Sequence, residues 1–160
     1  MTEKRKLSQD AQVAKLCRDY CKSIGVKASV TSDAVNSMVH LDVKDQAPNV
    51  VEQIKSHCNK YQWGDFGHEY KSDEQEQEDI PHTYNILFSN DLSEDMCARA
   101  WVWLKKRFWD NGEFRNAPNQ WAAAKNYQAL VWGYSVWDMT YLLLKGSGNL
   151  KKYSDEFWKE

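Results

Sequence analysis

The sequence predicts an α+β protein, in which helices pack a small, mainly antiparallel three-stranded sheet and a tryptophan-rich helical part follows. Apolar and polar residues alternate in three short segments, as in strands with one buried face. In the segments around them, apolar residues recur every three or four positions, as on one face of a helix. The expected order is α-β-β-α-β-α. Seven of the eight tryptophans then follow residue 100: Trp101, Trp103, Trp109, Trp121, Trp132, Trp137 and Trp158.

The first 45 residues predict a helix and a hairpin. Helical spacing runs from Ser8 to residue 24, where Ser8 can cap the start and Gly25 can end the helix. Alternation follows over 26–31 and 35–43. Because only a short polar segment separates these two strands, we expect them to pair as an antiparallel hairpin.

A second helix and a third strand complete the predicted first part. Pro48 opens the helix, where its missing amide hydrogen costs nothing, and the helix ends near Gly64. Alternation over 83–89 predicts the third strand. We interpret Asn90-Asp91 after it as a turn.

The remaining chain predicts helices only. Ser93 can cap a helix whose apolar stripe reaches Phe108. One long helix or two broken ones are expected over 119–145, and a short one over 154–159.

Composition suggests a domain organisation and a compartment. The 160 residues fit one domain-sized chain, and we divide it into an α/β module, 1–92, and a helical layer or subdomain, 93–160, expected to form one compact unit. The formal net charge is −2, and no signal-peptide core or membrane-spanning run is found, which predicts the cytoplasm and no membrane partner. Four cysteines lack disulfide-scaffold spacing and are expected to be reduced: Cys17, Cys21, Cys58 and Cys97.

The sequence contains no motif that predicts a catalytic residue, a metal ligand or a cofactor. Gly146-Ser147-Gly148 is interpreted as a helix stop, because it lacks the third glycine and the strand of a phosphate loop. Cys17 and Cys21 lie one helical turn apart, and His57-Cys58 could approach them as zinc ligands. Burial of these cysteines as small hydrophobes is the favoured interpretation.

Histidines leave an enzymatic alternative open. His40 and Asp42 share one strand face, and a carboxylate neighbour can set a histidine tautomer. No nucleophile is tied to them, so an unfamiliar site around His40, His57 or His68 is the weakest of three functional hypotheses.

An acid-rich segment spans residues 65–79, with seven carboxylates against the single Lys71. Most such segments are solvated loops. The alternative is that closely spaced carboxylates imitate a nucleic-acid backbone and occupy a basic groove in another protein.

The tryptophan-rich part also has two interpretations. Its rings are either bulk in a helical layer or platforms on which bases stack. Trp103 and Trp109 fall outside the main apolar stripe, and Lys105, Lys106 and Arg107 lie near them. Core or partner contact is favoured over nucleic acid, because the overall charge is close to neutral.

Several sequence segments together resemble a known small module. They are Gly25-Val26-Lys27-Ala28-Ser29-Val30, the helix at Pro48, Tyr61-Gln62-Trp63-Gly64-Asp65-Phe66 with Glu69-Tyr70, and Thr83-Tyr84-Asn85-Ile86-Leu87-Phe88-Ser89 with Leu92-Ser93. Over about residues 10–105 the chain resembles the large polyvalent protein-associated domain 29, found in proteins of phages and conjugative elements. The resemblance implies a mobile-element setting and carries over no catalytic residues.

We therefore expect a phage or mobile-element protein that binds a host protein or defence complex, possessing no enzymatic activity. An inhibitor of restriction or CRISPR defence is the type considered, and the oligomeric state stays open. The expected partner-binding residues are Trp63, Asp65, Phe66, Tyr70, Asp73, Glu74 and Glu76. The alternative is a nucleic-acid-binding accessory protein that uses Trp103, Lys105, Lys106, Arg107 and Trp109.

Overall fold

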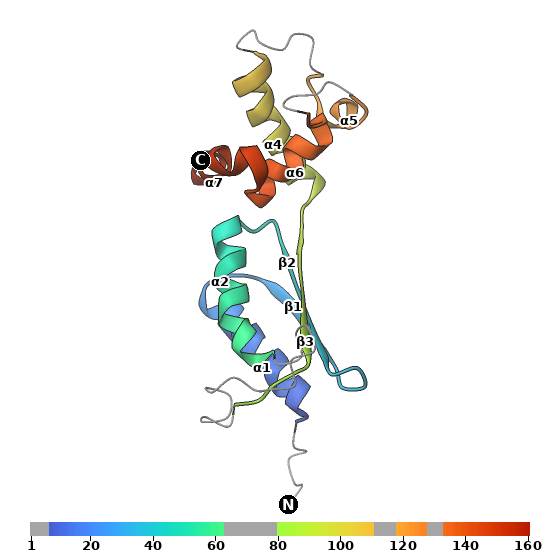
Figure 1. Ribbon diagram of the computed structural model, residues 1–160, viewed down its shortest axis with the longest axis vertical. Coiled ribbons are helices and arrows are strands. Elements are labelled where there is room, and N and C mark those ends of the chain that lie inside the picture. Colours follow the sequence, from blue (N-terminus) through green and yellow to red (C-terminus); the bar gives the residue numbers. More distant parts are fainter. Residues whose placement is uncertain (1–6, 63–79, 111–117, 128–132) are drawn as a thin grey trace, which may run out of the picture. The chain divides into compact units, whose positions relative to one another are not determined.

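The predicted α+β class is confirmed by the computed structural model, which describes residues 7–62, 80–110, 118–127 and 133–160. The chain divides into an N-terminal unit, Met1–Asp91, and a C-terminal unit, Leu92–Glu160. The first contains a three-stranded sheet with its helices, and the second contains the tryptophan-rich helices (Figure 1).

The sheet is mixed. Strands β1 (Ala28–Asp33) and β2 (Met38–Lys44) form the predicted antiparallel hairpin, and β3 (Asn85–Asp91) pairs with β2 in parallel, in the order β1-β2-β3. The sequence predicted a mainly antiparallel sheet. Helix α2 (Pro48–Cys58) follows β2 and carries the chain back along the sheet, so that the third strand runs in the same direction as β2.

The third strand extends further than predicted, because Asn90 and Asp91 belong to it and do not form a turn. The Gln46 amide hydrogen bonds to Asn90 Oδ1 (3.1 Å), and Asn90 Nδ2 donates to the Gln46 carbonyl (2.9 Å). The Asp45 amide also donates to the Asp91 carbonyl (2.9 Å). These distant partners hold in a strand two residues that favour turns locally.

The second strand begins later than its alternation suggests. Val35 is 94% exposed and lies in the hairpin turn. The carboxylate of Asp33 accepts hydrogen bonds from the amides of Val35 and Asn36, and Ser37 has a positive φ of 50°. The aspartate thus ends β1 and fixes the turn through local hydrogen bonds.

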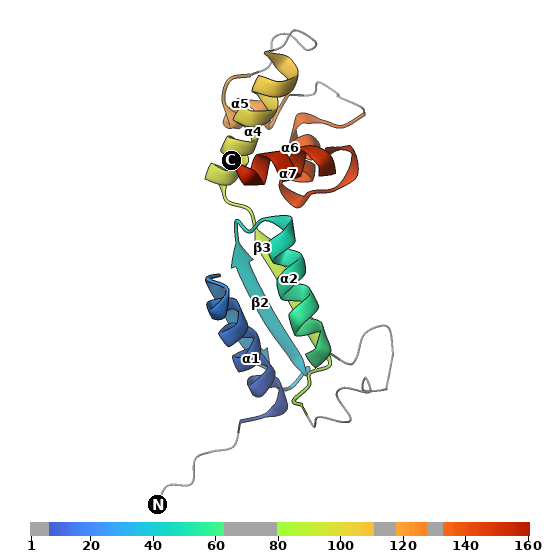
Figure 2. The same ribbon diagram turned by 90° about the vertical axis from the view of Figure 1, so that its left-hand side faces the viewer.

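Both helices of the N-terminal unit cover the same face of the sheet (Figures 1 and 2). Helix α1 (Gln9–Ser23) begins as predicted at Ser8, whose hydroxyl accepts from the Ala11 amide, and Gly25 follows its end with φ 76°. Helix α2 has Pro48 in its first turn. The core of the unit contains mainly apolar residues: Val13, Ala14, Cys17, Cys21, Val26, Val30, Val39, Leu41, Val43, Ile54, Cys58 and Tyr61.

The C-terminal unit consists of short helices. In chain order they are α4 (Glu94–Leu104), a π-helical turn (Lys105–Trp109), α5 (Trp121–Ala124), α6 (Val136–Lys145) and α7 (Lys151–Lys159). The hydroxyls of Ser93 and Ser135 cap α4 and α6, and Gly146 ends α6 in the left-handed conformation. Within the described parts of the chain, no helix combines the length and apolar character needed to cross a membrane.

Three of the six tryptophans in the described residues are buried in the core of this unit. Trp101, Trp109 and Trp121 are buried with Leu104, Met139 and their neighbours. Trp103 and Trp158 pack against this core from its edge, and Trp137 is 41% exposed. The interpretation of these rings as bulk therefore describes three of them, and Trp103 and Trp137 remain accessible.

Candidate functional site

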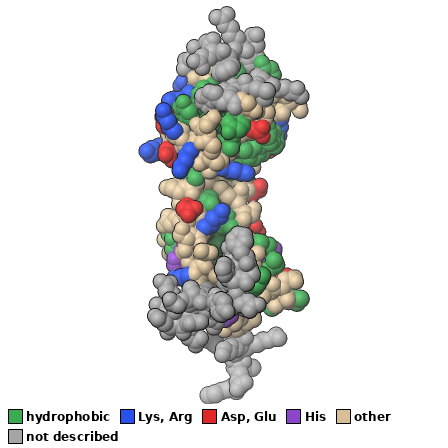
Figure 3. Space-filling view, in the orientation of Figure 1, with side chains coloured by type: hydrophobic (Ala, Val, Ile, Leu, Met, Phe, Trp, Pro, Cys, Tyr) green, Lys and Arg blue, Asp and Glu red, His purple; other side chains and the backbone are tan. Residues whose placement is uncertain are grey.

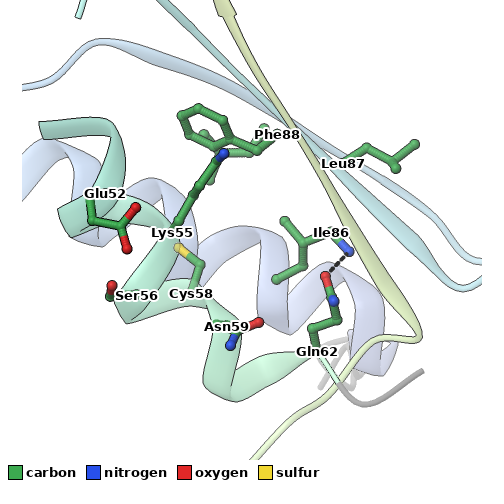
Figure 4. A pocket seen from close by; sticks show the side chains of 10 residues that line it. Glu52, Lys55, Ser56, Cys58, Asn59, Gln62, Ile86, Leu87 and Phe88 are labelled. Carbon is green, nitrogen blue, oxygen red and sulfur yellow. Dashed lines mark hydrogen bonds between the residues drawn. The ribbon is translucent and has the colours of Figure 1, made fainter. Parts of the chain in front are cut away.

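A hollow of about 500 Å³ lies between α2 and β3 (Figure 4). Exposed polar residues of α2 form one side, and the partly buried Ile86 and Phe88 of β3 form the other. We call it the β3 hollow; its lining residues are Leu41, Glu52, Lys55, Ser56, Cys58, Asn59, Gln62, Ile86, Leu87 and Phe88.

Beside the hollow, β3 forms an edge of the sheet. The Asn85 amide donates to the Ser37 carbonyl on the β2 side (3.2 Å), so by alternation Ile86, Phe88 and Asn90 direct their backbone groups to the other side. The first outward amide of this edge already has a partner in the same chain, because the Ile86 amide donates to Gln62 Oε1 (2.8 Å). Beyond Ile86, no hydrogen bond joins the outward backbone groups of Phe88 to another of the described residues.

The side chain of Phe88 helps to build the hollow. The Lys55 ammonium lies 5.3 Å from the centroid of the Phe88 ring, and Figure 4 shows both side chains at the same end of the hollow. Leu87 points away from α2. The combination of an open strand edge, an apolar floor and polar walls suits an extended peptide.

Three cysteines lie together behind this hollow. Cys17 and Cys21 of α1 and Cys58 of α2 are buried free thiols. A hydrogen bond with Cys58 and burial raise the pKa of Cys17, and burial raises the pKa of Cys21 to about 11. The same hydrogen bond lowers the pKa of Cys58. Across the described segments, no group of three or more potential ligands is placed to hold a metal ion.

We expect Cys58 to be the first thiol of this cluster to react with iodoacetamide in the native protein at pH 8. Its pKa is the lowered one, and it lines the β3 hollow, whereas Cys21 stays protonated at this pH. Peptide mass mapping during a time course measures the order, with urea-unfolded protein as the control in which the three rates converge. Equal or faster labelling of Cys21 would contradict the assignment.

The described histidines are not gathered at one place. His57 stacks on Tyr20 with ring centroids 3.7 Å apart, so it belongs to the packing between α1 and α2. His40 lies on the face of the sheet opposite the helices, in register with Thr31 and Leu87. Asp42 is on this same face, as predicted from the alternation. His68 lies outside the described residues.

A second candidate surface lies on α4 and the turn after it. Arg99, Val102, Trp103, Lys106 and Arg107 recur every three or four positions; we call this set the Trp103 face. The opposite side of the helix supplies the buried Cys97, Ala100, Trp101 and Leu104. In Figure 3, lysine and arginine side chains gather over the C-terminal unit.

The structure separates the residues that the sequence grouped as a nucleic-acid set. Trp103, Lys106 and Arg107 line a common hollow of about 500 Å³ together with Glu160. Trp109 is buried in the core, and Lys105 pairs with Asp110 at 2.6 Å. The π-helical turn explains the difference, because the extra residue in this turn directs Phe108 and Trp109 together into the core.

The structure adds Arg99 and Val102 to this surface, neither of which the sequence interpretation singled out. The sequence does contain a signal for this face, because Arg99, Trp103 and Arg107 are spaced four residues apart and would lie on one side of a helix. The residues of the β3 hollow had no comparable signal, because α2 and β3 come together only through the fold.

A third cluster contains stacked aromatic rings. The rings of Trp121 and Trp137 stack with centroids 5.4 Å apart, and Tyr141 lies 4.9 Å from Trp137. The Lys125 ammonium lies over both tryptophans and pairs with Glu94 at 2.7 Å. Since its cation is already neutralised, this cluster is less suited to an anionic partner than the Trp103 face.

The residues predicted to bind a partner lie outside the described part of the chain. This applies to Trp63, Asp65, Phe66, Tyr70, Asp73, Glu74 and Glu76, and to the acid-rich segment as a whole. Within the described residues, the candidate binding surfaces are therefore the β3 hollow and the Trp103 face.

The fold and these surfaces define a small α+β protein with a strand-edge hollow in one unit and a basic, aromatic helix face in the other. Comparison of the chain with protein-family models, curated proteins and solved structures gives no match.

Proposed function

We propose that this chain is a binding protein of a phage or other mobile element, acting in the host cytoplasm by occupying a host protein. A defence complex of the restriction or CRISPR type is the partner class we favour. The setting rests on an expectation from the sequence alone, the resemblance of about residues 10–105 to the large polyvalent protein-associated domain 29. The binding mode rests on one observation: the open edge of β3 lies beside the β3 hollow.

An extended segment of the partner would add to this edge as a further strand. Its backbone would pair with the outward N–H and C=O of Phe88, which supplies affinity without requiring a particular sequence. The bond from the Ile86 amide to Gln62 Oε1 supports this mode, because it shows an acceptor already placed on the same edge. Unpaired strand edges are in general templates for such pairing.

Alternate side chains of the added strand would enter the hollow and provide selectivity. An apolar side chain would contact Ile86 and Phe88, whose side chains are partly buried at its floor. Glu52 and Lys55 on the α2 side offer one charge of each sign. We therefore expect a partner segment with an apolar residue flanked by polar ones.

The acid-rich segment would add a second contact. Trp63, Asp65, Phe66 and Tyr70, with Asp73, Glu74 and Glu76, combine aromatic rings and carboxylates that suit a basic groove of the partner. This part of the proposal rests on the sequence alone.

Capture experiments with a hollow-filling variant test the proposal. Ser56→Trp places a large ring at the wall of the β3 hollow, and Gln53→Trp places the same ring at an exposed position of α2 outside it. We expect tagged wild type and Gln53→Trp to enrich the same host protein from a host lysate, and Ser56→Trp to lose at least about 90% of it, or roughly 1.4 kcal/mol. Quantitative mass spectrometry measures the enrichment.

The outcomes test the proposed function and the proposed binding site separately. No enriched protein with the wild-type chain would remove the proposed function. Equal enrichment by Ser56→Trp would remove the β3 hollow as the site, and loss after changing Asp73, Glu74 and Glu76 to serine would then assign binding to the acid-rich segment. Circular dichroism of each variant confirms that the fold is retained.

A further inference from the structure

The C-terminal unit has an arginine that is fixed in place before any partner binds. The Arg107 guanidinium carbon lies 5.4 Å from the centroid of the Trp103 ring and 5.1 Å from that of Tyr153. Arg107 Nη1 also pairs with Glu156 Oε2 at 3.0 Å. The stacked and paired guanidinium is held beside the Trp103 ring, so its plane loses little freedom when a ligand binds next to it.

Lys106 is the freest cation of the Trp103 face. It is exposed, and within the described residues no acid pairs with it. It lines two hollows, one with Trp103 and Arg107 and the other with Arg99 and Val102, and Glu160 is the acid that lines both. A ligand in either hollow would meet its ammonium group.

The other positions of this face combine charge with apolar surface. Arg99 is exposed with its guanidinium carbon 5.8 Å from the centroid of the Phe157 ring, and Val102 is 59% exposed. Residues 92–160 carry ten lysines and arginines against eight aspartates and glutamates, whereas the whole chain has a net charge of −2. Positive charge is thus concentrated in the unit that holds this face.

We propose that the Trp103 face binds single-stranded nucleic acid. A base would stack on the accessible part of the Trp103 ring, and the flanking phosphates would pair with Lys106 and Arg99. Two features together favour this ligand over an acidic protein segment: an aromatic ring in the middle of the surface, and cations on both sides of it along the helix. The site is independent of the β3 hollow, because it belongs to the other unit.

Fluorescence anisotropy of a fluorescein-labelled 20-nucleotide oligothymidylate, titrated with the full chain at low salt, tests the proposal. We expect Lys106→Glu to weaken binding at least roughly tenfold, and Lys27→Glu, the same charge change at an exposed site of the N-terminal unit, to leave it within about twofold. Lys106→Gln should lower the slope of log K against log salt by about 0.7, the value for one phosphate of a single strand.

A matched pair of variants isolates stacking from charge. Trp103→Leu keeps an apolar side chain against Phe157 but removes the ring, and we expect roughly fivefold or greater loss of affinity. Trp103→Phe keeps a ring and should recover most of it. An abasic oligomer of equal length and charge should bind the wild type more weakly than oligothymidylate.

Four results with nucleic acid would each overturn the proposal. They are no binding at tens of micromolar protein, an unchanged affinity of Lys106→Glu, equal affinity for the abasic oligomer, and tighter binding of a 20-base-pair duplex. Stronger binding of a glutamate-rich peptide than of oligothymidylate would also overturn it and assign the face to an acidic protein partner.

Discussion

Replacing Trp101 with alanine is expected to destabilise the C-terminal unit by about 3–5 kcal/mol, the usual cost of truncating a buried aromatic ring. Trp101 is fully buried, and its ring meets the Trp109 ring edge-on with centroids 5.0 Å apart. Its indole N–H also donates to the Pro118 carbonyl at 3.1 Å. The truncation therefore opens a cavity in the core and removes the donor for that carbonyl.

Urea unfolding followed by tryptophan fluorescence measures this effect. Seven of the eight tryptophans belong to residues 92–160, so the signal reports mainly on the C-terminal unit. Val102→Ala is the control, because the Val102 side chain follows Trp101 in the sequence but is 59% exposed. The free energy of unfolding of this variant should change by less than about 0.5 kcal/mol. A loss below about 1.5 kcal/mol for Trp101→Ala would show that the core is not centred on this ring.

The sequence was a good guide where local interactions decide the structure. Helix α1 starts at Ser8 because the serine hydroxyl accepts from an amide three residues on, and it ends before Gly25, which has a positive φ. The same applies to the Ser93 cap of α4. Periodicity and caps are both short-range, so the starts of α1 and α4 could be predicted, whereas α2 ends at Cys58, before the predicted end near Gly64.

Distant partners explain most of what the sequence did not predict. Asn90 favours a turn by composition, but its amide group bonds to the backbone of Gln46, forty-four residues earlier, and keeps β3 extended. The parallel pairing of β3 with β2 also depends on tertiary contacts. No pattern confined to a single segment contains this information.

The candidate sites show the same limit. If α4 continued as a regular α-helix, Trp109 would lie outside its buried stripe. The π-helical turn at Lys105–Trp109 directs it into the core instead. The β3 hollow joins Lys55 of α2 to Phe88 of β3, which are thirty-three residues apart. Sequence analysis could identify the chemistry of single segments, but it could not identify surfaces made by two elements.

A buried carboxylate in the N-terminal unit was also missed, and it leads to a second strong prediction. Asp10 in the first turn of α1 is only 7% exposed. Its Oδ1 accepts from the hydroxyls of Thr83 (2.8 Å) and Ser37 (3.0 Å), and the Ser37 hydroxyl in turn accepts from the Tyr84 amide (3.2 Å). One carboxylate therefore links α1, the end of the hairpin turn and the segment that leads into β3.

We expect Asp10→Ala to destabilise the N-terminal unit by about 2–3 kcal/mol, because hydrogen bonds to a charged group are lost and the buried Thr83 hydroxyl and the half-buried Ser37 hydroxyl keep fewer partners. The positive end of the α1 dipole favours a carboxylate at this position, which adds to the loss. Asp10→Asn keeps an acceptor oxygen and should cost about half as much. Asp19→Ala is the control, since its pair with Lys15 is more than half exposed on both sides and its loss should leave the free energy of unfolding nearly unchanged.

Hydrogen exchange measured by mass spectrometry distinguishes this mechanism from a general loss of stability. If the Asp10 carboxylate holds the start of β3, amides of the peptide covering Thr83 to Phe88 should exchange faster in Asp10→Ala at denaturant concentrations where those of α2 are still protected. The parallel β2–β3 pairing would then depend on a side chain of α1, seventy-three residues before Thr83. Uniform acceleration across α1, α2 and β3 would instead mean that the unit unfolds as a whole, with Asp10 contributing only to its total stability.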